Sequence, residues 1–297
     1  MEEKIKTSLC KSHINGCNSM KTLVVVLLIC LTGCANLSAY QKAQNITLKA
    51  NENGFKKIDV DTGIFTIRTF SKISNTEGSI HFYIEGDGRA WINKRRISQD
   101  PTPKNDLVLQ LASIDIAENV VYIARPCQYT GEEKNPAWNK TYWTDKRFSQ
   151  EVIDSANVVI DGYIKNNDFS NITLIGFSGG GAVVVLCAAE RDDVDEIVTI
   201  AGNLDHEKVN EYNQVTQLQN SLNPIDVAKD VKSVRQIHFV GKKDKIIPPF
   251  IAYNFKNVSG FPETIDIVEV DSVSHHSGWV KFWQSDSGLK KIVASKR

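Results

Sequence analysis

A serine flanked by glycines is the first residue whose surroundings indicate chemistry. Ser178 stands in the stretch Gly176-Phe-Ser-Gly-Gly180, between an apolar run typical of a strand, Ile172 to Ile175, and an apolar run typical of a helix. A serine at so sharp a turn has strained backbone angles, and the residues two before and two after it must be small because strand and helix approach closely. The pattern predicts that Ser178 is a nucleophile. The alternative, a glycine-rich phosphate loop, lacks the Gly-Lys-Ser/Thr that would follow.

A serine hydroxyl is a weak nucleophile, so the chemistry needs a base and a carboxylate that orients the base. Asp244 is the expected acid, because it lies in the turn Gly241 to Pro248 directly after a predicted strand, Gln236 to Val240. The alternative for Asp244 is a solvated charge among neighbouring lysines. Asp205 and Asp226 are the next candidates for the acid.

Two adjacent histidines are candidates for the general base. His275 and His276 stand in the loop between the last predicted strand, Ile265 to Val270, and a predicted final helix. The pattern alone leaves both open. The other histidines of the domain are expected to be structural, and they are His81, His206 and His238.

The turn after the predicted strand Ile80 to Ile84 reads Glu85-Gly-Asp-Gly88. Backbone amides of Gly179 and Asp87 are the expected pair of donors for an oxyanion. We expect the Asp87 side chain to point away and brace the loop, because a carboxylate beside an oxyanion would be unfavourable. Metal binding by Glu85 and Asp87 is the alternative, but no cluster of His or Asp accompanies them, so no metal is expected.

Composition narrows the classes of partner. The 297 residues carry 35 basic and 35 acidic side chains, and no basic stripe interleaved with aromatics is present, so a nucleic-acid partner is not expected. There is no G-x-G-x-x-G with a ribose-binding acid either. We therefore expect a small-molecule acyl substrate and no cofactor.

The N-terminal region reads as an export signal. Met20-Lys21 is followed by a short apolar core, Leu23 to Cys30, and then by Leu31-Thr-Gly-Cys34, which resembles the bacterial lipobox. The resemblance implies that residues 1–33 are removed and that Cys34 receives a lipid such as palmitate. Met20 is the alternative to Met1 as the start of translation. An ordinary signal with a chance cysteine is the alternative.

The predicted anchor defines the rest of the organisation. Residues 34–59 are polar and are expected to tether the anchor to a domain of residues 60–297. Ala35 and Asn36 contain no aspartate, and the rule for such lipoproteins then favours the outer membrane, facing the periplasm. Only Cys127 and Cys187 remain in the domain, and both are expected to be buried free thiols.

Strands and helices alternate along the domain, which predicts an α/β fold with a mostly parallel central sheet covered by helices on both faces. The predicted strands are Ile64 to Phe70, Ile80 to Ile84, Val120 to Ala124, Ile172 to Ile175, Ile197 to Ile200, Gln236 to Val240 and Ile265 to Val270. The predicted helices are Asp145 to Lys165, Gly180 to Glu190, Pro249 to Lys256 and Gly278 to Ala294. The first two strands have no helix between them, which suggests an antiparallel edge, and the segment Asn203 to Lys232 is expected to form a small cap.

Four further segments resemble a group of proteobacterial proteins of the α/β-hydrolase superfamily. The segments contain EGDGRAW, DPTP, RPCQY and a Trp-Thr motif, and they are Tyr83 to Trp91, Asp100 to Pro103, Ala124 to Tyr129 and Trp143 to Phe148. With GFSGGG and the histidine loop, the resemblance covers roughly residues 78–283. It implies an α/β-hydrolase fold and a Ser-Asp-His triad, and it leaves the substrate open.

The resemblance also ranks the candidates. The Gly-x-x-Asp pattern around Asp244 is similar to the acid loop after the seventh hydrolase strand, and the spacing from His275 to Trp279 favours His275 as base. A cysteine common in the group before Trp143 is missing here, so a bridge to Cys127 is not expected. Arg125 and Gln128 are expected either to line the site or to anchor a strand end.

These patterns predict a serine hydrolase that acts on an ester-like acyl substrate through an acyl-enzyme intermediate. One alternative is a non-catalytic envelope lipoprotein on a hydrolase scaffold, and the other is a peptidase or acyltransferase with the same triad. The substrate, the membrane leaflet and the oligomeric state stay open.

Overall fold

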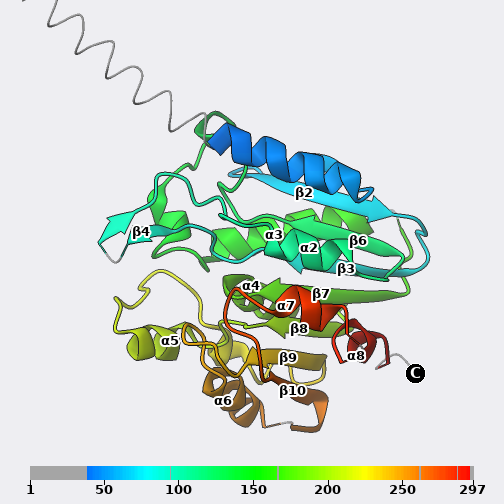
Figure 1. The fold of residues 1–297 in the computed structure, drawn as a ribbon, viewed down its shortest axis with the longest axis vertical. Coiled ribbons are helices and arrows are strands. Elements are labelled where there is room, and N and C mark those ends of the chain that lie inside the picture. Colours follow the sequence, from blue (N-terminus) through cyan, green and yellow to red (C-terminus); the bar gives the residue numbers. More distant parts are fainter. Residues whose placement is uncertain (1–38, 94, 166, 261, 286, 295–297) are drawn as a thin grey trace, which may run out of the picture.

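The computed structural model describes residues 39–294, except residues 94, 166, 261 and 286. A single eight-stranded sheet crosses the described molecule in the order β1-β2-β6-β3-β7-β8-β9-β10 (Figure 1). Its strands are β1 (Lys56–Asp61), β2 (Thr66–Ile73), β3 (Ser79–Ile84), β6 (Asn119–Ile123), β7 (Asn171–Phe177), β8 (Glu196–Ile200), β9 (Arg235–Gly241) and β10 (Ile265–Val270). A separate hairpin consists of β4 (Trp91–Asn93) and β5 (Arg96–Ile97).

The sheet is parallel from β6 to β10, and β2 is antiparallel to both of its neighbours, β1 and β6. Every residue of β6 and β8 is buried, as expected for strands that are covered on both faces. The predicted fold class is therefore confirmed. The antiparallel edge differs in detail, because β6 lies between β2 and β3 and the edge strand is β1.

Helices cover both faces of the sheet, and alternate residues of each strand point to opposite faces. On β7, Ile172 and Leu174 belong to one apolar cluster, whereas Ile175 and Phe177 belong to the other. The first cluster contains residues of α3 (Gln150–Ile164), α4 (Gly179–Ala189) and α6 (Phe250–Ser259). The second contains residues of α2 (Leu107–Ser113), α7 (Trp279–Trp283) and α8 (Leu289–Ala294).

The predicted final helix, Gly278 to Ala294, is two short helices, α7 and α8. The backbone of Gly288 approaches Phe282 and Trp283 so closely that a Cβ on Gly288 would lie 2.5 Å from the Phe282 carbonyl oxygen. A continuous helix cannot accommodate this contact. The chain therefore turns before α8 begins.

The domain begins earlier than predicted. Residues 39–52 form a helix that packs on the sheet, although they were expected to belong to the tether. Ile46 and Ala50 are buried in the second cluster, while Lys42 and Lys49 form ion pairs with Asp100 and Asp106. The helix has only a few apolar residues on one face, so its pattern does not stand out in a polar sequence. These few residues are sufficient to hold the helix in place because the sheet supplies the apolar surface on which they pack. Residues 34–38, with Cys34, lie outside the described part.

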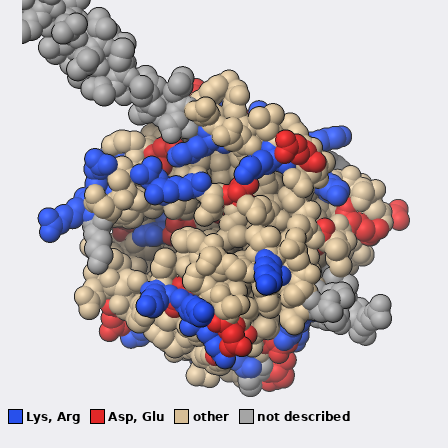
Figure 2. Space-filling view, viewed as in Figure 1, with Lys and Arg blue, Asp and Glu red and all other residues tan. Residues whose placement is uncertain are grey.

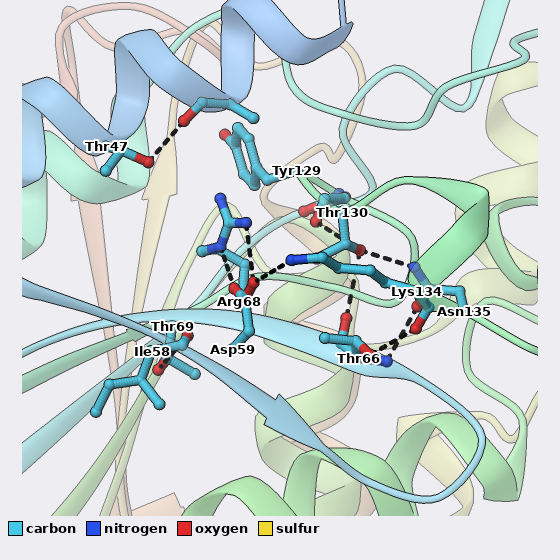
Figure 3. A network of polar contacts seen from close by, with 12 residues as sticks. Thr47, Ile58, Asp59, Thr66, Arg68, Thr69, Tyr129, Thr130, Lys134 and Asn135 are labelled. Carbon is cyan, nitrogen blue, oxygen red and sulfur yellow. Dashed lines mark hydrogen bonds and ion pairs between the residues drawn. The ribbon is translucent and has the colours of Figure 1, made fainter. Parts of the chain in front are cut away.

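Strand β1 was also predicted as tether, and Figure 3 shows what holds it. In the β1–β2 register Asp59 lies opposite Arg68, and the two side chains form a bidentate ion pair that Lys134 joins with Nζ 3.2 Å from Asp59 Oδ2. Thr69 Oγ1 donates to the carbonyl oxygen of Ile58 across the same pair of strands at 3.1 Å. A half-exposed edge strand tolerates such polar residues. Because of them, β1 lacks the apolar pattern by which a strand is predicted from sequence.

The predicted cap segment follows β8. It contains α5 (His206–Asn213) and a 3₁₀ turn (Pro224–Val227), and it packs on the loop before α3, where Leu222 donates its amide proton to the Phe148 carbonyl oxygen at 3.0 Å. In Figure 1, α5 lies at the edge of the sheet where the parallel strands end. None of the helices in the described ranges has the length and the apolar character needed to cross a membrane.

Candidate active site

Ser178 lies at the turn between β7 and α4 and has φ 52° and ψ −117°. A non-glycine residue in the left-handed region is strained, and the surrounding packing holds it there. A Cβ on Gly176 would lie 2.2 Å from the Gly180 carbonyl oxygen, and a Cβ on Gly180 would lie 2.2 Å from that of Ile84. The two glycines are therefore required for strand and helix to approach, as the sequence predicts.

Ser178, His275 and Asp244 form one hydrogen-bonded chain. His275 Nε2 is 3.0 Å from Ser178 Oγ, and His275 Nδ1 is 2.7 Å from Asp244 Oδ2. The three residues follow three different strands, β7, β10 and β9, and meet because parallel strands end at the same edge of a sheet. The structure thus brings together the residues that the sequence singled out.

The environment of Asp244 fixes the direction of this chain. Its Oδ1 accepts hydrogen bonds from the amides of Ile246 and Ile247 at 2.8 and 2.9 Å, and its side chain is fully buried. A carboxylate oxygen accepts, so His275 Nδ1 is the donor to Oδ2. His275 Nε2 then presents its lone pair to Ser178, which is the tautomer that a general base needs.

Trp279 explains the spacing that favours His275. Its Nε1 donates to the His275 carbonyl oxygen at 3.0 Å, so the start of α7 holds the histidine loop. The amide of Lys243 donates to the Val273 carbonyl oxygen at 3.1 Å, which ties the acid loop to the histidine loop. The acid and the base are therefore positioned as one unit.

His276 lies beside the chain without joining it. Its exposed ring packs edge-on against His275, with centroids 4.6 Å apart, and lies 6.0 Å from the ring of Phe177. Partial burial and the nearby His275 lower the pKa of His276. Of the two candidates for the base, only His275 contacts both Ser178 and Asp244.

The alternative acids have other tasks. Asp205 caps α5, accepting from the Lys208 amide at 3.1 Å, and Asp226 is exposed on the 3₁₀ turn. His206 is buried against Phe148. The remaining two predicted structural histidines are also buried, His81 with Nδ1 2.8 Å from Asp115 Oδ2 and His238 with Nδ1 2.8 Å from Thr199 Oγ1.

The loop after β3 faces the Ser178 turn. The amide of Gly86 donates to Glu85 Oε1 at 2.9 Å and is not available to a substrate. Within the described residues, the amides of Asp87 and Gly179 have no acceptor in the protein. These are the two donors that the sequence proposes for an oxyanion.

The Asp87 side chain differs from the prediction. It was expected to point away from the site, but its carboxylate lies over Gly179, where a Cβ would be 2.0 Å from Asp87 Oδ1. Arg147 Nη1 donates to Asp87 Oδ2 at 2.8 Å, and Arg125 Nη1 is 3.4 Å from Oδ1. Two guanidinium groups offset the negative charge that sequence reasoning considered unfavourable. Arg147 was not predicted, although it stands in the Trp143 to Phe148 segment.

Arg125 and Gln128 support the loop after β3. Gln128 Oε1 accepts from the Arg125 amide at 3.1 Å, and Gln128 Nε2 donates to the Gly86 carbonyl oxygen at 3.0 Å. Arg125 is buried, and its guanidinium lies over the ring of Phe148. Burial lowers the pKa of this guanidinium, and the negative charge of Asp87 opposes the decrease. The turn after β6 therefore supports the loop of residues 85–88, which we call the oxyanion loop because it contains the proposed donor Asp87.

Glu85 is a buried carboxyl group directly beside the same loop. Its Oε2 accepts from the Tyr122 hydroxyl at 2.9 Å and its Oε1 from the Gly86 amide. Burial raises the pKa of Glu85 to about 7, although these hydrogen bonds and Arg125 oppose the shift. No group of three metal-binding side chains occurs in the described ranges, and Cys127 and Cys187 are buried free thiols.

Similarity to known proteins is visible in structure and not in sequence. No model of a protein family and no curated protein sequence matches the chain. Among solved structures, Est1E from Butyrivibrio proteoclasticus superposes with a TM-score of 0.57 at 11% identity, covering 82% of this chain and 99% of that one. The Pyrococcus furiosus esterase Pf2001 gives 0.55 at 12% identity, with 82% and 89% covered.

A Pyrococcus horikoshii acylaminoacyl peptidase gives a TM-score of 0.54 at 11% identity, with 74% of this chain and 37% of that one covered. Numbered along the chain, the strands of the main sheet here have the order 1-2-4-3-5-6-7-8. Ser178, Asp244 and His275 follow the fifth, seventh and eighth of them. The chain therefore has the α/β-hydrolase fold.

Proposed function

We propose that this protein is a serine hydrolase that cleaves a carboxylic ester through an acyl-enzyme intermediate. The observation that carries the proposal is the chain from Ser178 Oγ through His275 to Asp244, with hydrogen bonds of 3.0 and 2.7 Å. Its geometry matches the needs of acyl transfer, in which a base takes the proton of the attacking hydroxyl and a carboxylate stabilises the imidazolium.

In the first half-reaction Ser178 Oγ attacks the acyl carbon while His275 Nε2 takes its proton. The negative charge that forms on the carbonyl oxygen is held by the amides of Gly179 and Asp87. Collapse of the tetrahedral intermediate breaks the bond to the leaving alcohol, which receives the proton from His275. Water then repeats the sequence on the acyl-enzyme and releases the acid.

The same residues could serve a peptidase or an acyltransferase, because the leaving group and the acceptor are chosen by the surroundings of the triad. We favour an ester because its leaving group needs less protonation than an amine. The cap segment after β8 is the part of the chain that would select the substrate. A non-catalytic lipoprotein would have no need for the strained Ser178 or for the unengaged amides opposite it.

We further propose that the mature protein is a lipoprotein anchored through Cys34, located at the outer membrane and facing the periplasm. The support is the lipobox at residues 31–34 and the absence of aspartate after it. Mass spectrometry of the mature N-terminus tests this proposal directly, because a diacylglyceryl group adds a defined mass to Cys34.

Labelling with a fluorophosphonate probe tests the catalytic proposal. The wild-type protein is expected to be labelled at Ser178 and to hydrolyse p-nitrophenyl esters, with a chain-length preference that defines the acyl pocket. Ser178→Ala and His275→Ala should abolish labelling. His276→Ala is the matched control, since it removes the adjacent imidazole, which bonds to neither Ser178 nor Asp244.

The outcomes separate the alternatives. Labelling that persists in His276→Ala and disappears in His275→Ala supports the proposed base. A folded wild type that takes up no probe and turns over no ester would favour the non-catalytic lipoprotein. Turnover of an aminoacyl amide at a higher kcat/KM than the matching ester would favour a peptidase.

A further inference from the structure

The described chain begins at the edge of the sheet that carries the candidate site. Strand β1 ends at Asp61, opposite Thr66, and β2 pairs near its start with the last residues of β6, so β1 ends at the carboxyl edge of the parallel strands. The helix of residues 39–52 leads into the opposite end of β1 and runs back along it. Residue 39 therefore lies at the site edge, as Figure 1 also shows.

This end of the helix is fixed to the oxyanion loop through a short relay. Lys42 Nζ is 3.3 Å from Asp100 Oδ2, and Asp100 Oδ1 accepts from the Thr102 amide at 2.8 Å. Between them, the Pro101 carbonyl oxygen accepts from the amide of Arg89, next to the glycine that closes the oxyanion turn. The start of the helix cannot move far without moving the loop opposite Ser178.

Only a short stretch separates this edge from the proposed anchor. Four residues lie between Cys34 and residue 39, and the five extended steps from Cys34 to residue 39 span at most about 17 Å. A lipid on Cys34 would therefore hold the site edge, and not the opposite edge, close to the bilayer.

Seven of the fifteen large apolar side chains that are exposed in the described residues lie at the same edge. They belong to the loops and helices that follow the carboxyl ends of the strands, and to the start of the first helix. They are Tyr40, Trp91, Tyr212, Val215, Leu222, Ile246 and Phe250. Tyr212 and Phe250 pack on each other edge-to-face with centroids 5.9 Å apart, so the exposed rings of α5 and α6 are in contact.

The β4–β5 hairpin adds positive charge. Residues 89–97 contain four basic residues and no acidic one, and Arg95, Arg96 and Trp91 are exposed, Trp91 at 44%. Figure 2 shows Lys and Arg side chains projecting at the edge where Figure 1 places β4. Tryptophan favours the membrane interface, and basic side chains favour anionic headgroups.

We propose that the site edge of this protein lies against an anionic phospholipid bilayer, with the β4–β5 hairpin at the headgroups and the entrance to Ser178 facing the lipid. Three observations favour this orientation: the positive charge of the hairpin, the exposed apolar side chains at the site edge, which we call the apolar rim, and the position of residue 39 at the same edge. It follows, resting on the proposed hydrolase function, that the substrate is an acyl ester carried in the membrane rather than one dissolved in water.

The free energies of membrane binding explain why the lipid anchor and the basic hairpin would act together. A basic residue near an anionic surface contributes about 1 kcal/mol, so the hairpin alone would bind weakly and reversibly. A lipid chain supplies attachment but no orientation. The hairpin and the rim therefore set which face of the anchored domain meets the bilayer.

The test uses the full lipidated chain in vesicles of phosphatidylethanolamine and phosphatidylglycerol that contain a phospholipid with brominated acyl chains. Trp138 is replaced by Phe in every protein tested because it is only half-buried, whereas Trp143, Trp279 and Trp283 are buried. Trp91 fluorescence is then expected to be quenched, and Trp91→Phe should remove most of the quenching. Ile116→Trp in the Trp91→Phe background provides a matched reporter at the opposite edge, where Ile116 is 64% exposed before β6. This reporter should stay unquenched.

Charge variants test the hairpin. Arg95→Gln with Arg96→Gln is expected to lower turnover of a bilayer-embedded ester by about 30-fold while leaving a water-soluble p-nitrophenyl ester unchanged. Lys56→Gln with Lys57→Gln removes the same charge from exposed residues at the start of β1, at the opposite edge, and should change neither rate.

The outcomes distinguish the two proposals. Equal quenching at residues 91 and 116, no quenching at residue 91, or a Cys34 without lipid would overturn the orientation. Quenching at residue 91 without turnover of either ester would leave the orientation standing and would contradict the hydrolase function. Equal effects of the two charge variants would overturn the role of the hairpin.

Discussion

The carboxylate of Asp87 fills the space that a side chain on residue 179 would occupy. A Cβ on Gly179 would lie 2.0 Å from Asp87 Oδ1 and 2.6 Å from its carboxyl carbon. Arg147 and Arg125 hold this carboxylate from the other side. The turn that carries Ser178 and the loop that faces it are thus interlocked through one side chain, and both proposed oxyanion donors belong to these two segments.

Gly179→Ala is expected to lower kcat by about 10- to 100-fold with little change in KM. The new methyl group displaces Asp87, and with it the amides that stabilise charge in the transition state rather than in the bound substrate. Steady-state kinetics with a p-nitrophenyl ester measures both constants.

A double-mutant cycle provides the control. In an Asp87→Ala background the methyl group has room, so Gly179→Ala should cost much less there than in the wild type. An equal loss in both backgrounds would show that the contact with Asp87 is not the cause.

Asp244→Asn is expected to lower kcat by about 10³- to 10⁴-fold, because an amide cannot hold His275 in the tautomer that presents Nε2 to Ser178. Asp205→Asn is the comparison. Asp205 caps α5 outside the proposed triad, and Asn caps a helix as well as Asp does, so this change should leave kcat within about twofold. A loss of kcat in Asp205→Asn as large as in Asp244→Asn would contradict the assignment of the acid.

Glu85→Gln is expected to flatten the pH dependence of stability. Burial raises the pKa of Glu85 from its ordinary value of 4.5 to about 7, so the folded protein holds this proton between these pH values and the unfolded chain does not. The stabilising contribution is present below pH 4.5 and is lost as pH rises through 7, a change of roughly 3 kcal/mol.

Urea unfolding from pH 5 to 8 measures this effect. The free energy of unfolding of the wild type should decline more steeply with pH than that of Glu85→Gln. Parallel curves for the two proteins would mean that Glu85 is ionised in the fold at pH 5.

The two cysteines of the domain are expected to be unreactive until the protein unfolds. Burial raises the pKa of Cys127 to about 12 and also raises that of Cys187, so neither presents a thiolate to a reagent near neutral pH. Ellman's reagent should detect no thiol in the native lipidated protein and two in denaturant. No thiol in denaturant would reveal a disulfide instead.

Much of this molecule could be predicted from local sequence. The continuous apolar runs of β6 to β10 identify buried parallel strands, because such runs have no other stable environment in a protein of this size. Gly176 and Gly180 identify the turn at Ser178, because no other residue type allows strand and helix to approach as closely there. Asp244 and the pair His275 and His276 became candidates because they follow predicted strands, which parallel topology brings to one edge, and the resemblance to the family then favoured Asp244 and His275.

What the sequence could not decide concerns residues whose partners lie far along the chain. The helix of residues 39–52 and strand β1 are polar enough to pass for a tether, and they fold because the sheet offers a surface to Ile46 and Ala50 and a counter-charge to Asp59.

The position of Asp87 is the clearest case of this kind. Because of its negative charge, we expected the Asp87 side chain to point away from the site. Arg147, 60 residues away in sequence, instead holds the carboxylate over Gly179. Local pattern thus identified the candidate residues for the chemistry. Only the tertiary structure decided how their charges are balanced, because an ion pair depends on distances in space that the order of residues does not contain.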